Sequence, residues 1–127
     1  MVLGIGIDLV SVSRMEKTLN QPWGSRFLKR VFAPSEICYC NKRLKPQEAF
    51  AARFAAKEAL VKALGTGFSG GVAPVQIIVD QGEKQSPIIR LSDRASVVAQ
   101  SMGVNRCSVS ISHTAGMACA MVVLERV

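Results

Sequence analysis

The chain has 127 residues, of which 49% are hydrophobic, and a formal net charge of +7 at pH 7. This length predicts one domain, residues 1–127, with enough apolar content to form a core without disulfides or a structural metal. A membrane protein is excluded, because no apolar run approaches the roughly 20 residues that a spanning helix requires.

The first predicted element is a strand over residues 2–10, composed of small and β-branched residues and expected to be buried. Asp8 is the only charged residue between positions 2 and 12. A carboxylate in such a setting needs either a cationic partner or hydrogen bonds from a turn, and the sequence leaves both open. The stretch lacks a basic start and Asp8 interrupts it, so we do not expect a signal peptide.

Helices are predicted next, with boundaries set by capping residues and prolines. The sequence Ser13-x-x-Glu16 is typical of a capping box at the start of a short helix. A long Ala- and Leu-rich helix follows, with Pro46 in its first turn and Gly65 as its left-handed stop. The predicted helices span residues 13–20, 25–32, 34–43 and 46–64.

The second half of the chain is mostly β structure. Strands are predicted at 75–80 and 88–91, a helix from Ser92 to Gly103, and a closing hairpin of 106–112 with 117–125. Helices come early, strands come late, and the strands are joined by tight turns. This order predicts an α+β fold with a mainly antiparallel sheet packed on the long helix.

The end of the long helix carries a pattern suited to phosphate chemistry. Glu58 and Lys62 lie one turn apart and precede a Gly-Thr-Gly turn at residues 65–67, which has little side chain to block a bound group. A carboxylate, an ammonium and a bare glycine turn suit a metal-bridged phosphate ester. The alternative is an ordinary Glu–Lys surface pair on a helix.

His113 is the only histidine, and it follows an alternating strand with serines on one face. A single histidine is often a packed or surface residue, but this position favours a site at a strand end. Four cysteines, Cys38, Cys40, Cys107 and Cys119, lack metal-type spacing. Free thiols are expected, which fits a cytoplasmic protein.

Positive charge is concentrated in residues 14–45, where eight basic side chains oppose Glu16 and Glu36, a net charge of +6. This asymmetry indicates an acidic partner, such as nucleic acid, a membrane surface or an acidic protein. A merely solvated basic face is the alternative.

Together these segments resemble one known family. The chain contains Gly-Ile-Gly-Ile-Asp8 with Arg14, Arg26-Phe27 with Glu36, Arg53-Phe-Ala-Ala-Lys-Glu58-Ala-x-x-Lys62-Ala-x-Gly-Thr-Gly and Ser-Ile-Ser-His113. In this order they resemble bacterial holo-acyl-carrier-protein synthase, the small type of 4′-phosphopantetheinyl transferase. The resemblance implies that family's fold.

The resemblance also implies an activity. These enzymes move the 4′-phosphopantetheine arm of coenzyme A to a serine of apo-acyl carrier protein, for fatty acid biosynthesis, and release adenosine 3′,5′-bisphosphate. By resemblance, Asp8 and Glu58 hold Mg²⁺ and, with Lys62, form the catalytic set. The residues that match coenzyme A contacts are Arg53, Lys62, Gly65 and His113. Which group accepts the serine proton is left open, with Glu58 as one candidate.

The family resemblance further implies a carrier-protein surface and an oligomer. Arg14, Arg26 and Arg30, with Phe27 as an apolar anchor, match the positions that dock the acidic carrier protein. Small family members are similar in being homotrimers with active sites between subunits.

Two other functions fit parts of the sequence. A nucleic-acid-binding module would use the basic segment, but one Trp and one Tyr leave little for base stacking. That reading also gives Asp8 and Glu58 no role, so we expect no nucleic-acid partner. A different transferase for coenzyme A or a nucleotide would use the same Lys62 and glycine turn.

Overall fold

A computed structural model of the chain describes all 127 residues, and the elements follow the predicted order. They are β1 (Val2–Ser11), α1 (Val12–Leu19), α2 (Gly24–Val31), α3 (Pro34–Asn41), α4 (Pro46–Leu64), β2 (Ile77–Gln81), β3 (Pro87–Leu91), α5 (Asp93–Met102), β4 (Arg106–Thr114) and β5 (Met117–Glu125). A short 3₁₀ turn, Pro74–Gln76, leads into β2, and another, Glu83–Gln85, joins β2 to β3. No helix is long and apolar enough to cross a membrane.

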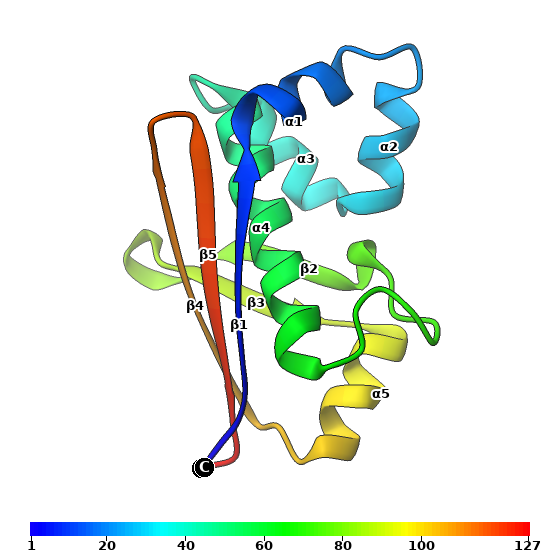
Figure 1. Cartoon of the computed structure of the whole chain (residues 1–127), viewed down its shortest axis with the longest axis vertical. Coiled ribbons are helices and arrows are strands. Elements are labelled where there is room, and N and C mark those ends of the chain that lie inside the picture. Colours follow the sequence, from blue (N-terminus) through cyan, green and yellow to red (C-terminus); the bar gives the residue numbers. More distant parts are fainter.

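All strand pairs are antiparallel, which confirms the predicted α+β class. The strands form two sheets, a three-stranded sheet in the order β1-β5-β4 and the hairpin β2-β3. In Figure 1 the three long strands run along the molecule, with α1, α2 and α3 at one end and α5 near the other. The two termini meet at the α5 end, where the Met1 amino group donates to the carbonyl oxygen of Arg126 at 2.8 Å.

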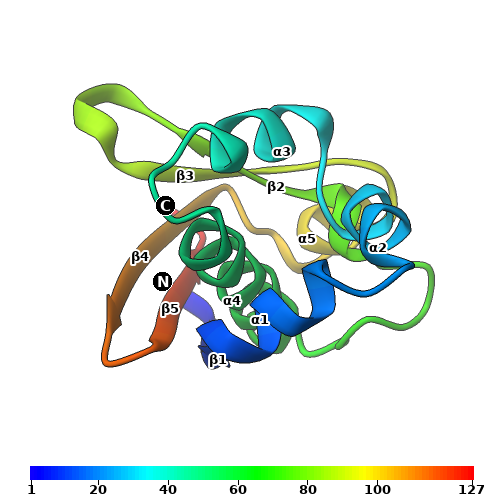
Figure 2. The same cartoon turned by 90° about the horizontal axis from the view of Figure 1, so that it is seen from above.

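Helix α4 lies at the centre, with the three-stranded sheet on one side and α3, β2 and β3 on the other (Figure 2). Most of its residues are buried, and six of these are alanines, so strands and helices approach it closely on several sides. Its end at Gly65, with φ of 80°, is as predicted. One apolar cluster surrounds its second half with β2, β5 and α5, and another packs its first half against α1, α2 and α3.

The packing of β1 on α4 depends on glycine. A Cβ atom at Gly4 would lie 2.1 Å from the carbonyl oxygen of Ala63, and one at Gly6 would lie 1.9 Å from that of Ala59. Because strand residues alternate, Asp8 lies on the same side of β1 as these glycines and faces α4. The glycines therefore bring Asp8 close to the helix that carries Glu58 and Lys62.

Two expectations for the first elements were wrong. Strand β1 is buried on one face only. On the side away from α4, Ile5, Ile7 and Leu9 are 68%, 58% and 63% exposed. The N-cap of α1 is Ser11, whose Oγ accepts from the Arg14 amide at 3.3 Å, and not Ser13. The helix begins directly where β1 ends, so both Ser13 and Glu16 lie inside it.

Candidate active site

Asp8 has a cationic partner on α4. Lys62 Nζ donates to Asp8 Oδ1 at 3.0 Å and to the carbonyl oxygen of Ile7 at 2.9 Å. The Asp8 side chain is only 17% exposed, so this ion pair compensates a largely desolvated carboxylate. Lys62 forms no ion pair with Glu58, one turn earlier on the helix, and the Glu–Lys surface pair considered above is not present.

Glu58 and Asp8 line one groove of about 380 Å³, which we call the Asp8 groove. Burial raises the pKa of Glu58, and the neighbouring Asp8 carboxylate raises it further, while Lys62 lowers it. Two carboxylates that disfavour each other's charge are suited to a shared cation. No group of three or more His, Cys, Asp or Glu side chains is arranged for a metal. A two-carboxylate site still fits Mg²⁺, which commonly takes one or two carboxylates along with phosphate and water oxygens.

The walls of the Asp8 groove come from β1, α1, α2 and α4. Arg14 and Phe27, both predicted to contact the carrier protein, line it beside Glu58. Its other lining residues are Leu9, Val10, Ser11, Met15, Thr18 and Phe54. Arg26 and Arg30 are exposed on α2 and do not line the groove.

Arg53 and His113 line a different cavity of about 660 Å³, which we call the Arg53 pocket. Its walls are formed by α3, α4, the β2–β3 turn and β4. The basic side chains Arg43 and Lys45 also line it. The four residues predicted to contact coenzyme A therefore do not meet within one protomer. Arg53 and His113 line the Arg53 pocket, whereas Lys62 pairs with Asp8 and Gly65 lies at the end of α4.

Arg53 is buried without a carboxylate partner. The residue is 4% exposed, its Cζ lies 4.0 Å from the centre of the Tyr39 ring, and its Nε has no hydrogen-bond partner. In the amide orientation that satisfies its hydrogen bonds, the Gln81 side-chain oxygen accepts from Arg53 Nη2 and from the Tyr39 hydroxyl group, both at 3.2 Å. A guanidinium that lines a pocket and has no carboxylate partner is suited to an anionic ligand.

His113 lies at the rim of the same pocket. Its side chain is 56% exposed, and its Nδ1 is 4.0 Å from Glu48 Oε1. It is in register with Ala118 of β5, which in turn pairs with Val10 of β1, so both cavities open at the same end of the three-stranded sheet.

Sequence reasoning missed Tyr39, Gln81, Arg43 and Lys45 as pocket residues. It treated residues 14–45 as one basic surface, whereas Arg43 and Lys45 line the Arg53 pocket. One signal was available, because the only tyrosine of the chain precedes Arg43 by four residues, and Arg43 Cζ lies 5.4 Å from its ring.

Comparisons with known proteins agree with this architecture. Residues 4–122 match the model of the 4′-phosphopantetheinyl transferase superfamily. A holo-[acyl-carrier-protein] synthase of Koribacter versatilis (strain Ellin345) is 45% identical over 125 residues, which cover 98% of this chain and 99% of that protein.

Solved structures give the same result. The holo-[acyl-carrier-protein] synthase of Neisseria meningitidis superposes with a TM-score of 0.89 at 35% identity, covering 99% of this chain and 100% of that one. The Helicobacter pylori synthase, solved in complex with coenzyme A, superposes with a TM-score of 0.83 at 36% identity, covering 95% of this chain and 99% of that one. The chain belongs to the 4′-phosphopantetheinyl transferase superfamily. The resemblance to bacterial holo-acyl-carrier-protein synthases is confirmed, and so is the fold.

Proposed function

We propose that this protein transfers the 4′-phosphopantetheine arm of coenzyme A to a serine of apo-acyl carrier protein, in fatty acid biosynthesis. The observation that carries the proposal is the meeting of Asp8, Glu58 and Lys62 beside a groove lined by Arg14 and Phe27. Family membership over nearly the whole chain supports it, as does the coenzyme A complex of the Helicobacter pylori relative.

In this reaction the serine oxygen bonds to the phosphorus nearer the pantetheine, and the phosphorus–oxygen bond to the adenosine 3′,5′-bisphosphate leaving group breaks. The Lys62 ammonium acts as a compact positive charge on the pyrophosphate oxygens. Asp8 and Glu58 would hold Mg²⁺, which neutralises charge on those oxygens. The raised pKa of Glu58 makes its carboxylate a stronger proton acceptor, so Glu58 remains a candidate base for the serine proton.

The Arg53 pocket would hold the nucleotide phosphates of coenzyme A. Its cationic lining residues are Arg43, Lys45, Arg53 and, when protonated, His113. Arg53 contributes a buried guanidinium that no carboxylate of this chain neutralises. Phosphate oxygens match the fork of N–H donors on such a side chain.

The outer face of the three-stranded sheet supports a homotrimer. Ile5, Ile7 and Leu9 of β1, with Met117 and Met121 of β5, expose large apolar side chains there. Exposed apolar patches of this kind are typical of protein interfaces. We infer that second and third copies of the chain cover this face, and that the Asp8 groove of one subunit and the Arg53 pocket of a neighbour together hold one coenzyme A.

The carrier protein would dock on α1 and α2. Arg14, Arg26 and Arg30 are exposed there and carry the charge that attracts an acidic partner, while Phe27 offers a partly buried apolar contact. The docking face would thus begin at the edge of the Asp8 groove, where the serine has to arrive.

We place the protein in the cytoplasm, which its thiols fit. All four cysteines are free. Burial raises the pKa of Cys40 to about 12 and that of Cys107 to about 11, so both remain neutral thiols.

The direct test is the stoichiometry of nucleotide release. With coenzyme A, Mg²⁺ and an apo-acyl carrier protein, we expect one adenosine 3′,5′-bisphosphate per carrier protein consumed. Nucleotide release without carrier protein would point to a hydrolase or a different transferase. Tight binding of nucleic acid with no release would support the binding-module alternative.

A further inference from the structure

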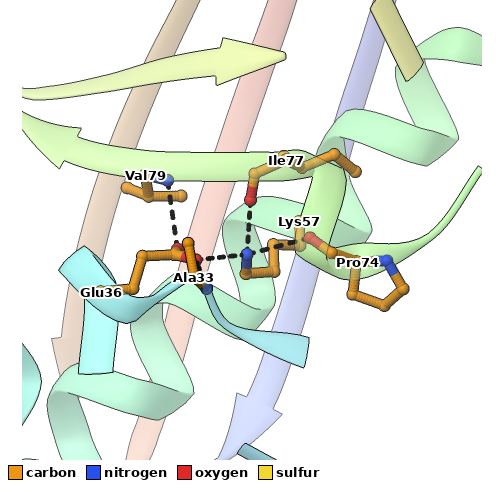
Figure 3. Close-up of polar contacts among 6 residues, drawn as sticks. All are labelled: Ala33, Glu36, Lys57, Pro74, Ile77 and Val79. Carbon is orange, nitrogen blue, oxygen red and sulfur yellow. Dashed lines mark hydrogen bonds and ion pairs between the residues drawn. The ribbon is translucent and has the colours of Figure 1, made fainter. Parts of the chain in front are cut away.

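A buried ion pair joins α3 to α4 and has no role in the reaction described above. Lys57 Nζ lies 2.8 Å from Glu36 Oε1, and both side chains are 0% exposed (Figure 3). Lys57 also donates to the carbonyl oxygens of Pro74, at 3.0 Å, and Ile77. Its three N–H donors thus bond to α3, to the 3₁₀ turn before β2 and to the first residue of β2.

Glu36 is equally well satisfied. Its Oε1 accepts from the Ala33 amide at 2.8 Å, and its Oε2 accepts from the Val79 amide at 3.1 Å. Figure 3 shows the two side chains meeting between α3, α4 and β2. The pair therefore fixes the start of α3, the turn before β2 and β2 itself to one point on α4.

Stability alone does not account for this arrangement. Burial lowers the pKa of the Lys57 ammonium, which shows that desolvation opposes its charge, although Glu36 partly restores it. Replacing a buried ion pair by apolar side chains of similar volume is often neutral or stabilising, whereas removing one partner is strongly destabilising. What the pair supplies beyond an apolar contact is directional bonding, which sets the spacing of its elements.

The same three elements form walls of the Arg53 pocket. Arg53 precedes Lys57 by four residues on α4, and Tyr39 follows Glu36 by three on α3, so each shares a helix face with a member of the pair. Gln81 lies two residues beyond Val79, on the same face of β2. Arg53, Tyr39 and Gln81 therefore lie beside the ion pair at the junction of α3, α4 and β2.

We infer that the Glu36–Lys57 pair is a positioning element for the Arg53 pocket: it holds α3 and β2 so that Tyr39 and Gln81 flank the Arg53 guanidinium. This inference rests on the proposed function in assigning coenzyme A to the pocket. The Asp8 groove takes its walls from β1, α1, α2 and the side of α4 that carries Glu58, and the Glu58 side chain, although it follows Lys57 in the chain, forms no hydrogen bond or ion pair with Glu36 or Lys57. Loss of the pair therefore weakens coenzyme A binding and spares carrier-protein recognition.

The test is the double variant Glu36→Leu/Lys57→Met, which removes both charges and leaves neither unpaired. We expect a folded protein with a Kd and a KM for coenzyme A raised on the order of tenfold, about 1.4 kcal/mol. The KM for carrier protein stays within about twofold, because the docking helices keep their charges. Calorimetry with coenzyme A alone measures the Kd without turnover.

The matched control is Val122→Ala, which weakens the packing of β5 on the other side of α4 and should leave both KM values unchanged. Glu36→Gln/Lys57→Met provides a second probe if the first double variant does not fold, because the amide keeps the shape of the carboxylate and no buried charge is left unpaired. It should also raise the KM for coenzyme A.

Parental values for coenzyme A in either folded double variant would overturn the inference. An equal rise in both KM values would also overturn it, since a general loosening of the fold would then be the cause. Failure of the parent protein to release adenosine 3′,5′-bisphosphate would refute the proposed function instead. The calorimetric Kd values for coenzyme A would still show whether the Glu36–Lys57 pair positions the Arg53 pocket.

Discussion

Lys62 Nζ lies 3.0 Å from Asp8 Oδ1, so the proposed catalytic lysine and the first proposed metal ligand are each other's partners in the free protein. In the proposed reaction these residues act on different groups, Lys62 on the pyrophosphate and Asp8 on Mg²⁺. We therefore expect substrate and cation to compete with this pair as they bind. Because the Lys62 side chain is 53% exposed, this ion pair is weak enough to be exchanged.

Removal of Lys62 should accordingly have opposite effects on metal binding and on catalysis. Lys62→Ala should bind Mn²⁺, a probe for the Mg²⁺ site, more tightly than the parent in the absence of coenzyme A, because Asp8 loses its competing cation. Transfer should slow by about 2–4 kcal/mol in activation free energy, by analogy with the loss of one preorganised donor. Lys62→Arg should restore only part of the rate, since a planar fork replaces a point charge.

Titration with Mn²⁺ and steady-state kinetics check these effects, with Lys17→Ala on α1 as a control that should change neither. Unchanged Mn²⁺ affinity in Lys62→Ala would show that the ion pair does not compete with the metal.

Replacement of Asp8 should abolish transfer and also alter the pH dependence of stability. Burial and Asp8 hold the pKa of Glu58 above its ordinary value of 4.5. A raised pKa in the folded state means that stability is highest below the ordinary pKa and is lost as the pH rises through the raised one. Asp8→Asn removes one cause of the raised Glu58 pKa, so the variant should lose less stability than the parent as the pH rises.

Chemical unfolding of the metal-free proteins between about pH 4 and pH 7 checks this. Arg106 lowers the pKa of Glu125, but this effect is common to parent and variant and cancels in the difference. Identical pH profiles, or near-normal transfer by Asp8→Asn, would contradict the assignment.

Disruption of the outer sheet face should separate the subunits. Ile7 is 58% exposed in the isolated chain, and an Ile7→Asp change would bury a charge in the proposed trimer interface. We expect a folded monomer by sedimentation, with transfer activity lost. Val97→Asp on α5, where the parent side chain is 50% exposed, is the control and should remain trimeric. A fully active monomeric parent would refute the oligomer.

Mixed trimers test whether two subunits build each site. Glu58→Ala alters the Asp8 groove and Arg53→Met alters the Arg53 pocket, so each homotrimer should be impaired. Subunit exchange between them should restore some activity, because a mixed trimer can combine an intact groove with an intact pocket. Absence of any recovery after verified exchange would favour sites within single subunits.

Charge reversal on α1 or α2 should act on carrier-protein recognition. Arg14→Glu or Arg26→Glu should raise the KM for carrier protein and change the Kd for coenzyme A little. The parent KM for carrier protein should also rise with salt, because exposed charges are screened. Arg126→Glu, near the end of the molecule opposite α1 and α2, is the matched control. If Arg14→Glu and the control behave alike, the basic face serves another purpose.

The fold could be predicted largely because its elements carry local signals. Gly65 ends α4 as expected, and the alternation that includes Gly4, Gly6 and Asp8 places the carboxylate against that helix. The exposed side of β1 could not be foreseen, because a strand with an apolar exposed face, which we propose faces other subunits, has the composition of a buried one.

Tyr39 and Gln81 of the Arg53 pocket, and the Glu36–Lys57 pair, were missed for a different reason. Lys57 lies in an Ala-rich helix whose charges suggest a surface, and its partner is 21 residues away. Tyr39 and Gln81 meet through a contact between α3 and β2, 42 residues apart in the chain. Neither contact leaves a periodic pattern in the sequence, so only the packed structure shows them.

The central claim is transfer of the phosphopantetheine arm, and the most direct test is the intact mass of the acceptor. Apo-acyl carrier protein incubated with the parent protein, coenzyme A and Mg²⁺ should gain the mass of one 4′-phosphopantetheine arm, located on a single serine. Glu58→Ala should leave the carrier protein unchanged under the same conditions. A parent protein that leaves the mass unchanged, or a Glu58→Ala variant that modifies the carrier as fast as the parent, would contradict the account.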